Sequence, residues 1–573
     1  MPRSSPFAAS FSLVARDLAR SFAGHTVLDG VDLTIGPRTR VGVVGPNGVG
    51  KSTLLRLLAG LERPDRGSVT LAPATARVGY LSQEPDRRPG ETLLASLARR
   101  TGVAAAEEEL ERAAGTVAAG TPGAGDAYAG ALDRYLAAGG PDLEARARQV
   151  CADLGLRPDR LDAGTATLSG GQAARASLAG VLLSRFDVLL LDEPTNDLDF
   201  AGLARLERFV DELPGGVVIV SHDRAFLERT VTAVLELDEH SRTGTQYSGG
   251  FVAYLEQRAT ARRHAEEAYA GYHAERVRLQ AGARTQRQWA TEGVRRAQRD
   301  SDERDKFIRT FRVNSSEQLA AKAKATERAL DRLEAVEKPW QGWDLRMRVA
   351  AVARSGDTVA RLDGAVVERD RFTLGPVDLE ITWGERVVIG GPNGSGKTTL
   401  LLALLGRLPL TTGTARLGPG VVVGEMDQAR HRFTGGITLL DAFLRASGLL
   451  VADARSALAK FGLGPDRVLR PAGTLSPGER ARAVLAQFSA RGVNCLVLDE
   501  PTNYLDLPAI EQLEAALDTY EGTLLLVTHD RRFLESVRVT RAVAIAAGSV
   551  IRTVPMGESR PSPRTAGETW RPV

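Results

Sequence analysis

Residues 41–55 of the chain read VGVVGPNGVGKSTLL, and residues 387–401 read VVIGGPNGSGKTTLL. In both stretches an apolar, β-branched run leads into a Gly-rich loop that ends in Lys-Ser or Lys-Thr, and an apolar helical pattern follows. A strand, a Gly-rich loop and a helix in this order are what a phosphate-binding loop requires. The chain therefore predicts two such loops.

Each loop has a physical means of binding phosphate. Successive backbone N–H groups line a concavity for the anion, and the N-terminus of the following helix adds positive potential. Lys51 and Lys397 would bring a charge to the β- and γ-phosphates, and a hydroxyl beside each lysine would reach Mg²⁺. The candidate nucleotide-binding residues are Gly45, Pro46, Asn47, Gly48, Gly50, Lys51, Ser52 and Thr53 in the first loop, and Gly391, Pro392, Asn393, Gly394, Gly396, Lys397, Thr398 and Thr399 in the second, with Ser52 and Thr398 as metal ligands.

A second motif, LDEPTN, ends an apolar run at residues 191–196 and again at 498–503. Open α/β sheets bind ligands at the carboxyl ends of their strands, which is where these acids fall. Asp192 and Asp499 are placed to hold Mg²⁺. Glu193 and Glu500 follow one residue later and are the candidates for polarising a water molecule against the γ-phosphate.

The motifs define an internal repeat. The acids of LDEPTN and the histidines of VSHDR and VTHDR, His222 and His529, recur after 307 residues, whereas the loop lysines are 346 apart. The first copy therefore carries extra residues, which we place at about 98–150 in an Ala/Glu-rich helical region broken by GTPGAG. The predicted domains are an α/β domain at 1–250, a helical linker at 251–341, a second α/β domain at 342–555 and a disordered, Pro-rich tail at 556–573.

Composition limits the classes of protein that fit. The chain has 573 residues, 43% of them hydrophobic, and a net charge of only +3. Its two cysteines, Cys151 and Cys495, are too few for the zinc clusters of excision-repair ATPases or for iron–sulfur clusters. No uninterrupted apolar run approaches 18 residues and the N-terminus lacks an apolar leader, so we expect a cytoplasmic protein.

Further motifs complete a known pattern. LSGGQ at 168–172 and LSPGE at 475–479 precede the two LDEPTN strands, and YLSQE and EMDQ supply Gln83 and Gln428. Phosphate loop, glutamine, signature, acidic strand and histidine thus occur twice in order, and the chain resembles a pair of ATP-binding cassettes of the P-loop NTPase fold. The resemblance implies one site made of Lys51, Ser52, Gln83, Asp192, Glu193 and His222 with Ser476, Gly478 and Glu479, and another made of Lys397, Thr398, Gln428, Asp499, Glu500 and His529 with Ser169, Gly170, Gly171 and Gln172.

Two departures from that pattern stand out. Pro477 replaces the first glycine of the second signature, which the first position of a helix tolerates because no N–H is needed there. Phe22 fits the position of an aromatic that stacks on adenine, although a core phenylalanine is an alternative. The corresponding place in the second copy holds Glu368, so we expect the second site to bind its base less firmly.

The linker at 251–341 predicts a helical hairpin. A first helix runs from Phe251 towards Leu279, with Tyr254, Ala261, Ala265, Ala268 and Tyr272 near heptad spacing, and a second runs from about 316 to 336. Residues 257–338 hold 19 Lys and Arg against 13 Asp and Glu. Between the two predicted helices, basic residues surround Phe307, Ile308 and Phe311 in the sequence. Basic residues interleaved with aromatic ones are typical of proteins that bind RNA. A solvated coiled-coil face with inward-facing aromatics is the alternative.

Tandem cassettes without a membrane span, a linker that opens with YSGGFVAY and a charged helical hairpin together resemble the ABC-F family. The resemblance implies a monomeric, Mg²⁺-dependent ATPase with an intramolecular cassette sandwich and with the ribosome (rRNA and tRNA) as partner. It places the protein at the E site, the linker towards the tRNA at the peptidyl-transferase centre, and residues 98–150 on the large subunit. Protection from antibiotics is our preference over regulation of translation. The alternative is an ATP-binding subunit that serves a separate permease.

Overall fold

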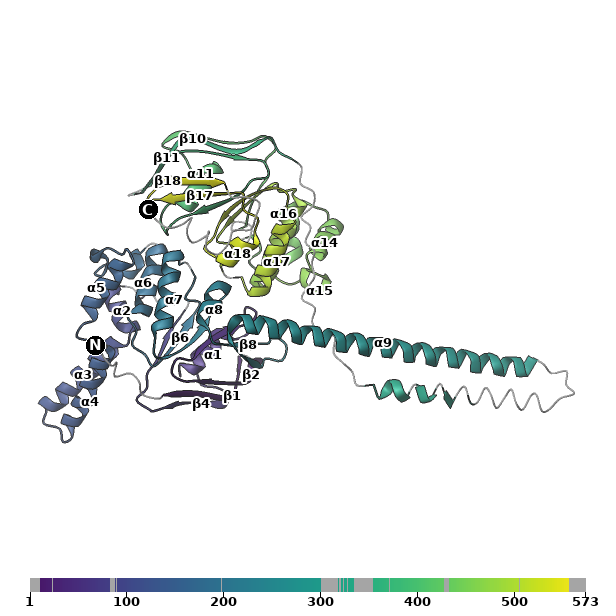
Figure 1. The fold of residues 1–573 in the computed structure, drawn as a ribbon, viewed down its shortest axis with the longest axis horizontal. Helices are drawn as coiled ribbons and strands as arrows, with labels where there is room; N and C mark the ends of the chain where they lie inside the picture. The colour runs from purple at the N-terminus through teal and green to yellow at the C-terminus, as the bar shows by residue number, and fades with distance from the viewer. Residues whose placement is uncertain are drawn as a thin grey trace. The chain divides into compact units, whose positions relative to one another are not determined.

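The computed structural model gives the fold of the chain (Figure 1). It describes residues 11–555 except for 23, 83–87, 89, 169, 197, 300–317, 319–320, 323, 327, 334–353, 370–371, 427–431 and 504. The chain falls into two compact units, Met1–Val252 with Leu345–Val573, and Ala253–Asp344. The first unit contains both copies of the repeat, and the second contains the linker.

In the described residues, the first copy forms a six-stranded sheet of order β5-β6-β7-β3-β8-β9. Its strands are parallel except for β9, which pairs antiparallel with β8. Strands β3, β6 and β7 are buried along their whole length, which explains their continuous apolar sequences. The bounds are β3 Arg40–Val44, β5 Val78–Leu81, β6 Val188–Asp192, β7 Gly216–Val220, β8 Ala233–Leu237 and β9 Gly244–Ser248.

The second copy repeats this topology. Its described strands form a six-stranded sheet of order β14-β15-β16-β12-β17-β18, again with only the last pair antiparallel. The α/β fold expected for both copies is therefore confirmed. The bounds are β12 Arg386–Gly390, β14 Val423–Glu425, β15 Cys495–Asp499, β16 Thr523–Val527, β17 Arg541–Ala546 and β18 Ser549–Pro555.

Each copy also has a smaller antiparallel sheet and a set of helices. The small sheets have the orders β2-β1-β4 and β11-β10-β13 in the described chain. In the first copy the bounds are β1 Ser12–Phe22, β2 His25–Ile35, β4 Arg66–Ala72, α1 Lys51–Leu58, α2 Leu93–Arg100, α5 Leu143–Asp153, α6 Gly170–Leu182, α7 Phe200–Glu212 and α8 Arg224–Thr230. In the second they are β10 Thr358–Arg369, β11 Phe372–Thr382, β13 Thr412–Leu417, α11 Lys397–Leu404, α13 Leu439–Ser447, α14 Val451–Lys460, α15 Pro465–Val468, α16 Pro477–Ala490, α17 Leu507–Asp518 and α18 Arg531–Ser536.

The topology brings the sequence motifs to one edge of each large sheet. Strands β6, β7 and β3 are neighbours in the sheet. The acids of LDEPTN, the histidine of VSHDR (the switch histidine, His222, with His529 as its counterpart) and the phosphate loop follow their respective carboxyl ends. Parallel strands end at the same edge, so three segments far apart in the chain meet there. The corresponding strands β15, β16 and β12 do the same in the second copy.

The extra residues of the first copy form a helical hairpin. Helices α3 (Val103–Ala118) and α4 (Ala124–Ala138) lie side by side, and the Gly-rich stretch GTPGAG contains the turn between them (Figure 1). Nε and Nη2 of Arg134 donate to Oε2 and Oε1 of Glu109 across the hairpin, at 2.9 and 2.7 Å. Both helices lie within about 98–150, the region where the offsets of the repeat place the extra residues.

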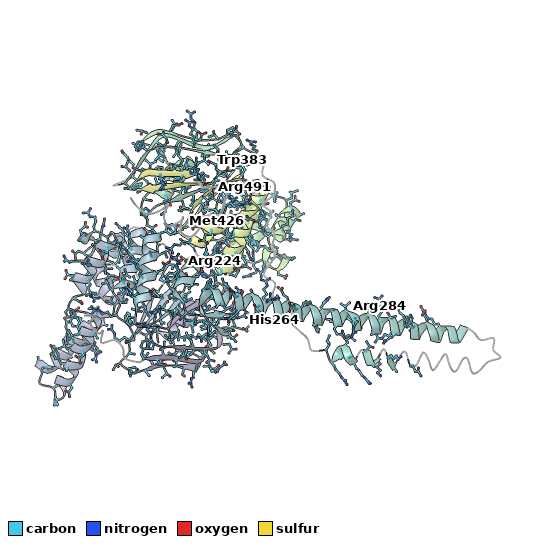
Figure 2. The ribbon with its side chains drawn as sticks, viewed as in Figure 1. Arg224, His264, Arg284, Trp383, Met426 and Arg491 are labelled. Atoms are coloured by element: carbon cyan, nitrogen blue, oxygen red, sulfur yellow. The ribbon has the colours of Figure 1, made fainter. Side chains whose placement is uncertain are left out.

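The linker begins as one long helix, α9, which spans Gly250–Arg299 (Figure 1). His264 and Arg284 are among the side chains that project from it (Figure 2). In the second compact unit, the hydroxyl of Thr326, in a further helical segment, donates to Oε1 of Gln286 at 3.1 Å. No described helix is apolar and long enough to cross a membrane.

The near-heptad spacing in the first linker helix predicts that its small residues face the second helix, and this prediction is wrong for those before Leu279. Ala261, Ala265 and Ala268 are exposed, whereas Ala283 is buried. Because Thr326 lies opposite Gln286, an antiparallel partner that reaches Leu333 extends back only to about Leu279 along α9. The small residues before that point therefore have no partner helix within the described linker.

Candidate nucleotide-binding sites

The two phosphate loops are folded alike around their lysines. Nζ of Lys51 donates to the carbonyl oxygens of Gly45 and Pro46 at 2.8 and 3.1 Å, and Nζ of Lys397 does so to Gly391 and Pro392 at 2.8 and 3.3 Å. Each lysine also lies 3.4 Å from Oδ1 of the loop asparagine. Burial lowers the pKa of both ammonium groups. A buried cation whose hydrogen bonds go to neutral acceptors is well placed to bind phosphate.

Glycines fix the shape of these loops. Gly50 and Gly396 have φ of 111° and 106°, and each ends its loop just before the helix that carries the lysine. A Cβ on Gly50 would lie 2.7 Å from Cγ1 of Val27, and a Cβ on Gly391 would lie 2.1 Å from the carbonyl oxygen of Ile545. Only glycine therefore fits both the conformation and the space.

Oxygen ligands suited to Mg²⁺ meet at the carboxyl end of each acidic strand. Ser52 lies close enough to Asp192 to oppose the rise in the pKa of that carboxyl, and Thr398 donates to Oδ2 of Asp499 at 2.7 Å. Oδ1 of Asp192 is buried and accepts no hydrogen bond from the described residues. Hydroxyl and carboxylate oxygens are the ligands that Mg²⁺ prefers, so these residues fit the ion.

The first site pairs a glutamate with a neutral histidine. Nε2 of His222 lies 3.1 Å from Oε1 of Glu193, and both side chains are largely buried. Burial raises the pKa of Glu193 to about 7 and lowers that of His222 to about 3. The histidine is therefore neutral at physiological pH and donates to the glutamate through Nε2–H. This bond orients the carboxylate that faces the phosphate loop.

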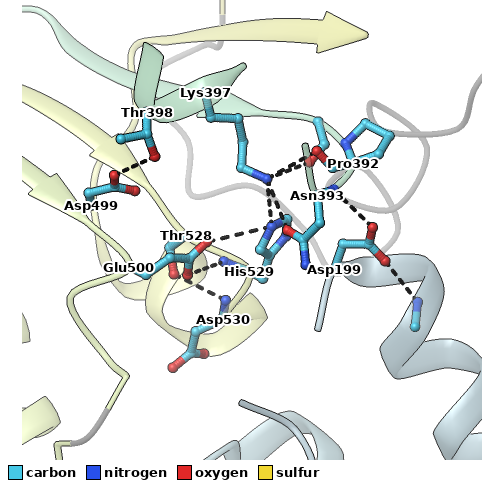
Figure 3. A network of polar contacts seen from close by, with 12 residues as sticks. Asp199, Pro392, Asn393, Lys397, Thr398, Asp499, Glu500, Thr528, His529 and Asp530 are labelled. Carbon is cyan, nitrogen blue, oxygen red and sulfur yellow. Dashed lines mark hydrogen bonds and ion pairs between the residues drawn. The ribbon is translucent and has the colours of Figure 1, made fainter. Parts of the chain in front are cut away.

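The second site arranges the same residue types differently (Figure 3). Nζ of Lys397 lies 2.9 Å from Nε2 of His529, whose pKa burial lowers to about 3. Because the lysine donates, Nε2 of His529 acts as an acceptor there, and Oε1 of Glu500 lies 3.5 Å from it. Oε2 of Glu500 accepts instead from the backbone N–H of His529 at 3.3 Å. The two sites are therefore not equivalent.

Both candidate catalytic glutamates have left-handed backbones. The φ of Glu193 is 50° and that of Glu500 is 45°. Their backbone N–H groups still donate to Val220 and Val527 on the neighbouring strands, at 2.9 and 2.8 Å. A non-glycine residue in this region costs about 1–3 kcal/mol and is commonly kept at functional sites. The sequence gives no sign of this turn.

Two aspartates that sequence reasoning missed join each loop to the opposite copy. Oδ2 of Asp506 accepts from the backbone N–H of Asn47 at 3.1 Å, and Oδ2 of Asp199 accepts from that of Asn393 at 3.0 Å (Figure 3). Both aspartates also cap helices, Asp199 at Gly202 and Asp506 at Ala509. The signal was present in LDEPTNDLD and its recurrence, where the final acid follows the Mg²⁺ aspartate by seven residues.

The second signature packs against one of these aspartates. A Cβ on Gly478 would lie 3.7 Å from Oδ1 of Asp506 and 3.2 Å from Cβ of Ala509. Gly478 therefore adjoins the residue that bonds to the first phosphate loop.

A capping box holds the start of this signature helix. Oγ of Ser476 accepts from the N–H of Glu479, and the carboxylate of Glu479 accepts from the N–H of Ser476. Pro477 occupies the first turn of α16, so the expected tolerance of proline is confirmed. Glu479 also pairs with Arg467 at 2.6 Å, which marks it as a structural residue of the signature.

Other predicted residues are placed only in part. Gly170 and Gly171 lie in the first turn of α6 with Gln172, and Gly48 and Gly394 occupy the loops with positive φ. The hydroxyl of Thr53 accepts from Arg56 at 3.3 Å, and Thr399 lies in α11. Gln83, Gln428, Ser169, residues 300–317 at the linker tip and the tail 556–573 lie outside the described residues.

Phe22 lines the same cavity as Lys51 and Ser52, which has a volume of about 420 Å³. Its ring is 40% exposed, which excludes a core position, and the guanidinium of Arg20 lies 4.7 Å from the ring centroid. In the second copy the exposed Glu368 offers no ring. Sequence spacing missed Phe372, however, whose Cζ would lie 2.6 Å from a Cβ on the loop residue Gly396. Phe372 takes the place against the loop that Val27 has in the first copy.

Comparison with known proteins agrees with this geometry. A family described as "ABC transporter" matches residues 28–196 and 374–503. The tylosin resistance ATP-binding protein TlrC of Streptomyces fradiae is 36% identical over 549 residues, covering 92% of this chain and 96% of its own. The energy-dependent translational throttle protein EttA of Mycobacterium tuberculosis is 32% identical, covering 92% and 90%. ABC transporter F family member 5 of Arabidopsis thaliana is 30% identical, covering 93% and 74%.

Proposed function

Because this chain belongs to the ABC-F family of tandem ATP-binding-cassette proteins, we propose that it is a cytoplasmic, Mg²⁺-dependent ATPase that acts on the ribosome. It binds near the E site and uses cassette closure on ATP to position its linker towards the tRNA and the peptidyl-transferase centre. The observation that carries the proposal is the pair of hydrogen bonds by which Asp199 and Asp506 each reach the phosphate loop of the other copy.

The residues of each site supply the steps of hydrolysis. Lys51 and the loop N–H groups hold the phosphates, and Ser52 with Asp192 would hold Mg²⁺, which neutralises charge on the β- and γ-phosphates. Glu193, oriented by the Nε2–H of His222, polarises the attacking water. The second site uses Lys397, Thr398, Asp499 and Glu500 in the same roles. His529 differs from His222, because its Nε2 accepts from Lys397 and its backbone N–H donates to Glu500.

One hydrogen bond between the two copies lies in the phosphate loop itself, next to the site of hydrolysis. Asn47 sits in the first phosphate loop and bonds to an aspartate that also borders the second signature. A nucleotide that orders the loop therefore favours the arrangement in which the two copies touch. Release of phosphate removes that preference, and this exchange is how ATP would move the linker.

The linker is the part of the protein that closure of the cassettes would move. Helix α9 is 50 residues long, about 75 Å at the usual rise, and carries exposed cations such as Arg284 and Arg287 beside the exposed Trp289. Cations and an exposed ring suit RNA phosphates and bases. The name of the relative EttA refers to translation, which supports the ribosome as the partner.

We favour antibiotic protection as the biological outcome, because TlrC, at 36% identity over nearly its whole length, is named for tylosin resistance. Expression in a sensitive host should raise the inhibitory concentration of tylosin or of a lincosamide or pleuromutilin. An unchanged susceptibility panel with altered protein synthesis would favour regulation of translation instead.

Replacing Glu193 and Glu500 with Gln tests the proposed ribosomal ATPase. Gln keeps size and hydrogen bonding but cannot polarise the attacking water, so nucleotide binding should persist while hydrolysis stops. The cassettes should then stay closed, and the variant should co-sediment with 70S ribosomes in ATP but not in ADP. The measurement is sedimentation through a sucrose cushion with each nucleotide.

The matched control is Lys51→Ala with Lys397→Ala, which removes the phosphate charges. It should hydrolyse nothing and remain in the supernatant with either nucleotide. If the double-Gln variant binds ATP yet stays in the supernatant at low salt, the ribosomal function is wrong. An ATP-binding subunit that serves a separate permease then becomes the better reading of the same sites.

A further inference from the structure

Tyr80 lies beside the Mg²⁺ aspartate of the first site. It occupies β5, which pairs in parallel with β6, and it is opposite Leu190, two residues before Asp192. Its hydroxyl donates to Oδ2 of Asp192 at 3.1 Å. The side chain is half-buried, so this bond lies away from bulk water.

A cation lies on the other side of the phenol. Arg56, on the helix that follows the phosphate loop, is close enough to Tyr80 for its charge to act on the pKa of the phenol. Nε of Arg56 also donates to Oε1 of Glu62 at 2.5 Å. The hydroxyl of Tyr80 directs its proton to Asp192, and the Arg56 guanidinium can only donate, so it does not compete for that proton. Glu62, Arg56, Tyr80 and Asp192 therefore form a chain of neighbouring side chains.

This chain distinguishes the two oxygens of Asp192. Oδ2 accepts from Tyr80, while Oδ1 is buried and accepts no hydrogen bond from the described residues. A carboxylate with one oxygen occupied cannot rotate without losing that bond. The other oxygen is thereby fixed and left available to a cation or its bound water.

The second copy keeps the aspartate, Asp499, but has different residues in place of the other three. At the position of Tyr80 stands Glu425, opposite Val497 and two residues before Asp499. Its carboxylate cannot donate a hydrogen bond when ionised, and it pairs with Arg407 at 2.9 Å instead. Leu402 and Leu408 replace Arg56 and Glu62 at the same offset of 346 residues that relates the loop lysines.

We propose that Tyr80 is a positioning residue that presents Asp192 to the metal, so that the first site binds divalent cation more tightly than the second. The inference rests on the proposed Mg²⁺-dependent ATPase function and goes beyond it by assigning unequal metal affinity to the two sites. Tyr80 acts through Asp192 and need not touch nucleotide. Loss of a partner of this kind typically weakens metal affinity 10- to 100-fold.

Single-site variants make the two affinities measurable. Lys397→Ala leaves the first site to bind nucleotide, and Lys51→Ala leaves the second. Each full-length protein is saturated with a non-hydrolysable ATP analogue, and Mn²⁺ binding is titrated by electron paramagnetic resonance. The first site should bind Mn²⁺ more tightly. Tyr80→Phe, which removes one oxygen and keeps the ring, should weaken that binding roughly tenfold.

Two further variants separate positioning from packing. Arg56→Leu, which copies Leu402, should weaken Mn²⁺ binding at the first site in the same direction as Tyr80→Phe. Tyr520→Phe removes another buried hydroxyl, one that donates to the carbonyl of Val493 in the second copy, and should leave the Mn²⁺ affinity of the first site unchanged. Affinity for the analogue in EDTA should be the same for all three.

Equal Mn²⁺ affinities of the first site with and without the Tyr80 hydroxyl would overturn the inference while leaving the ATPase function intact. A loss of analogue binding in EDTA on Tyr80→Phe would also overturn it, because the residue would then shape the pocket itself. If the unmodified protein binds neither analogue nor Mn²⁺, both the proposed function and this inference are wrong.

Discussion

Asp530 is a buried carboxyl next to the switch histidine of the second copy. It caps α18, where Oδ1 accepts from the N–H of Phe533 at 2.9 Å. Burial, and then the charge of Asp223 from the other copy, raise the pKa of Asp530 to about 7, against the opposing charge of Arg224. Glu514 also faces it and raises the pKa further. Asp223 is the equivalent residue of the first copy, and burial raises its pKa as well.

Asp530 should make the stability of the folded protein depend on pH. Because the folded pKa is raised, the native chain retains a proton that the unfolded chain releases near pH 4, so stability falls as pH rises towards about 7. Asp530→Asn keeps the helix cap and carries no charge. Its melting temperature should exceed that of the wild type at pH 8 by at least roughly 2 °C, about 1 kcal/mol, and match it near pH 4.

Asp530→Ala is the control for this comparison. It also removes the charge but loses the cap, so it should melt lower than the Asn variant at both pH values with the same pH dependence. Thermal melts followed by circular dichroism measure both. If the Asn variant and the wild type respond equally to pH, the buried carboxyl does not titrate with folding.

Among the helices, α7 and α17 each begin at an aspartate that caps the helix and also accepts a hydrogen bond from the phosphate loop of the other copy. Oδ1 of Asp506 caps α17 at 3.1 Å while Oδ2 reaches the backbone of Asn47 in the opposite copy. Capping is a local property, and serine performs it nearly as well as aspartate. The single oxygen of serine cannot make both bonds.

Asp506→Ser and Asp506→Ala should therefore separate the two roles. The Ala variant loses the cap and should be less stable by about 1 kcal/mol, whereas the Ser variant should keep most of that stability. Both should lose ATP turnover to a similar degree, because both lose the bond to Asn47. Steady-state hydrolysis and thermal melts measure the two effects.

Thr438→Ala provides a matched control. Thr438 caps α13 by accepting from the N–H of Asp441 at 3.1 Å and makes no contact with the phosphate loops among the described residues. It should lower stability like Asp506→Ala and leave turnover unchanged. Full turnover in Asp506→Ser would show that the bond between the copies is dispensable.

At the scale of the whole molecule, two ion pairs join the copies in equivalent positions. Arg224 pairs with Glu514, and Nη1 of Arg531 lies 2.8 Å from Oε1 of Glu207. The two arginines and the two glutamates are each 307 residues apart, and each arginine follows the switch histidine by two residues. All four side chains are largely buried, so a mismatched charge there costs more than at an exposed surface.

Reversing these charges should control closure. Arg224→Glu places a third carboxylate beside Glu514 and Asp530 and should weaken ATP-dependent closure at least about tenfold, while Arg224→Glu with Glu514→Arg should restore it. Small-angle X-ray scattering of the double-Gln protein with ATP and with ADP reports closure. The exposed pair Arg148–Glu144 lies within one copy, so Arg148→Glu should have no effect. Failure of the double reversal to restore closure would contradict a direct pairing.

The local chemistry of this protein follows from short stretches of its sequence. Gly-rich loops, strand-ending acids and the capping box at Ser476 are specified by residues close together in the chain, because turn conformation and helix starts depend on neighbours. The offsets of 307 and 346 residues located the insertion, which the structure shows as the α3–α4 hairpin. The α/β fold followed from the same motifs.

Which distant residues meet depends on how the strands and helices pack together. Asp506 reaches Asn47 across 459 positions, and Tyr80 meets Asp192 only because β5 and β6 are neighbours in the sheet. Counting residues led to Glu368, whereas the strand pair β10–β11 brings Phe372 to the loop. Local periodicity carries no information about such contacts, since packing between elements sets them. For the same reason, the position of the partner helix determines which residues of α9 are buried, and heptad spacing alone does not.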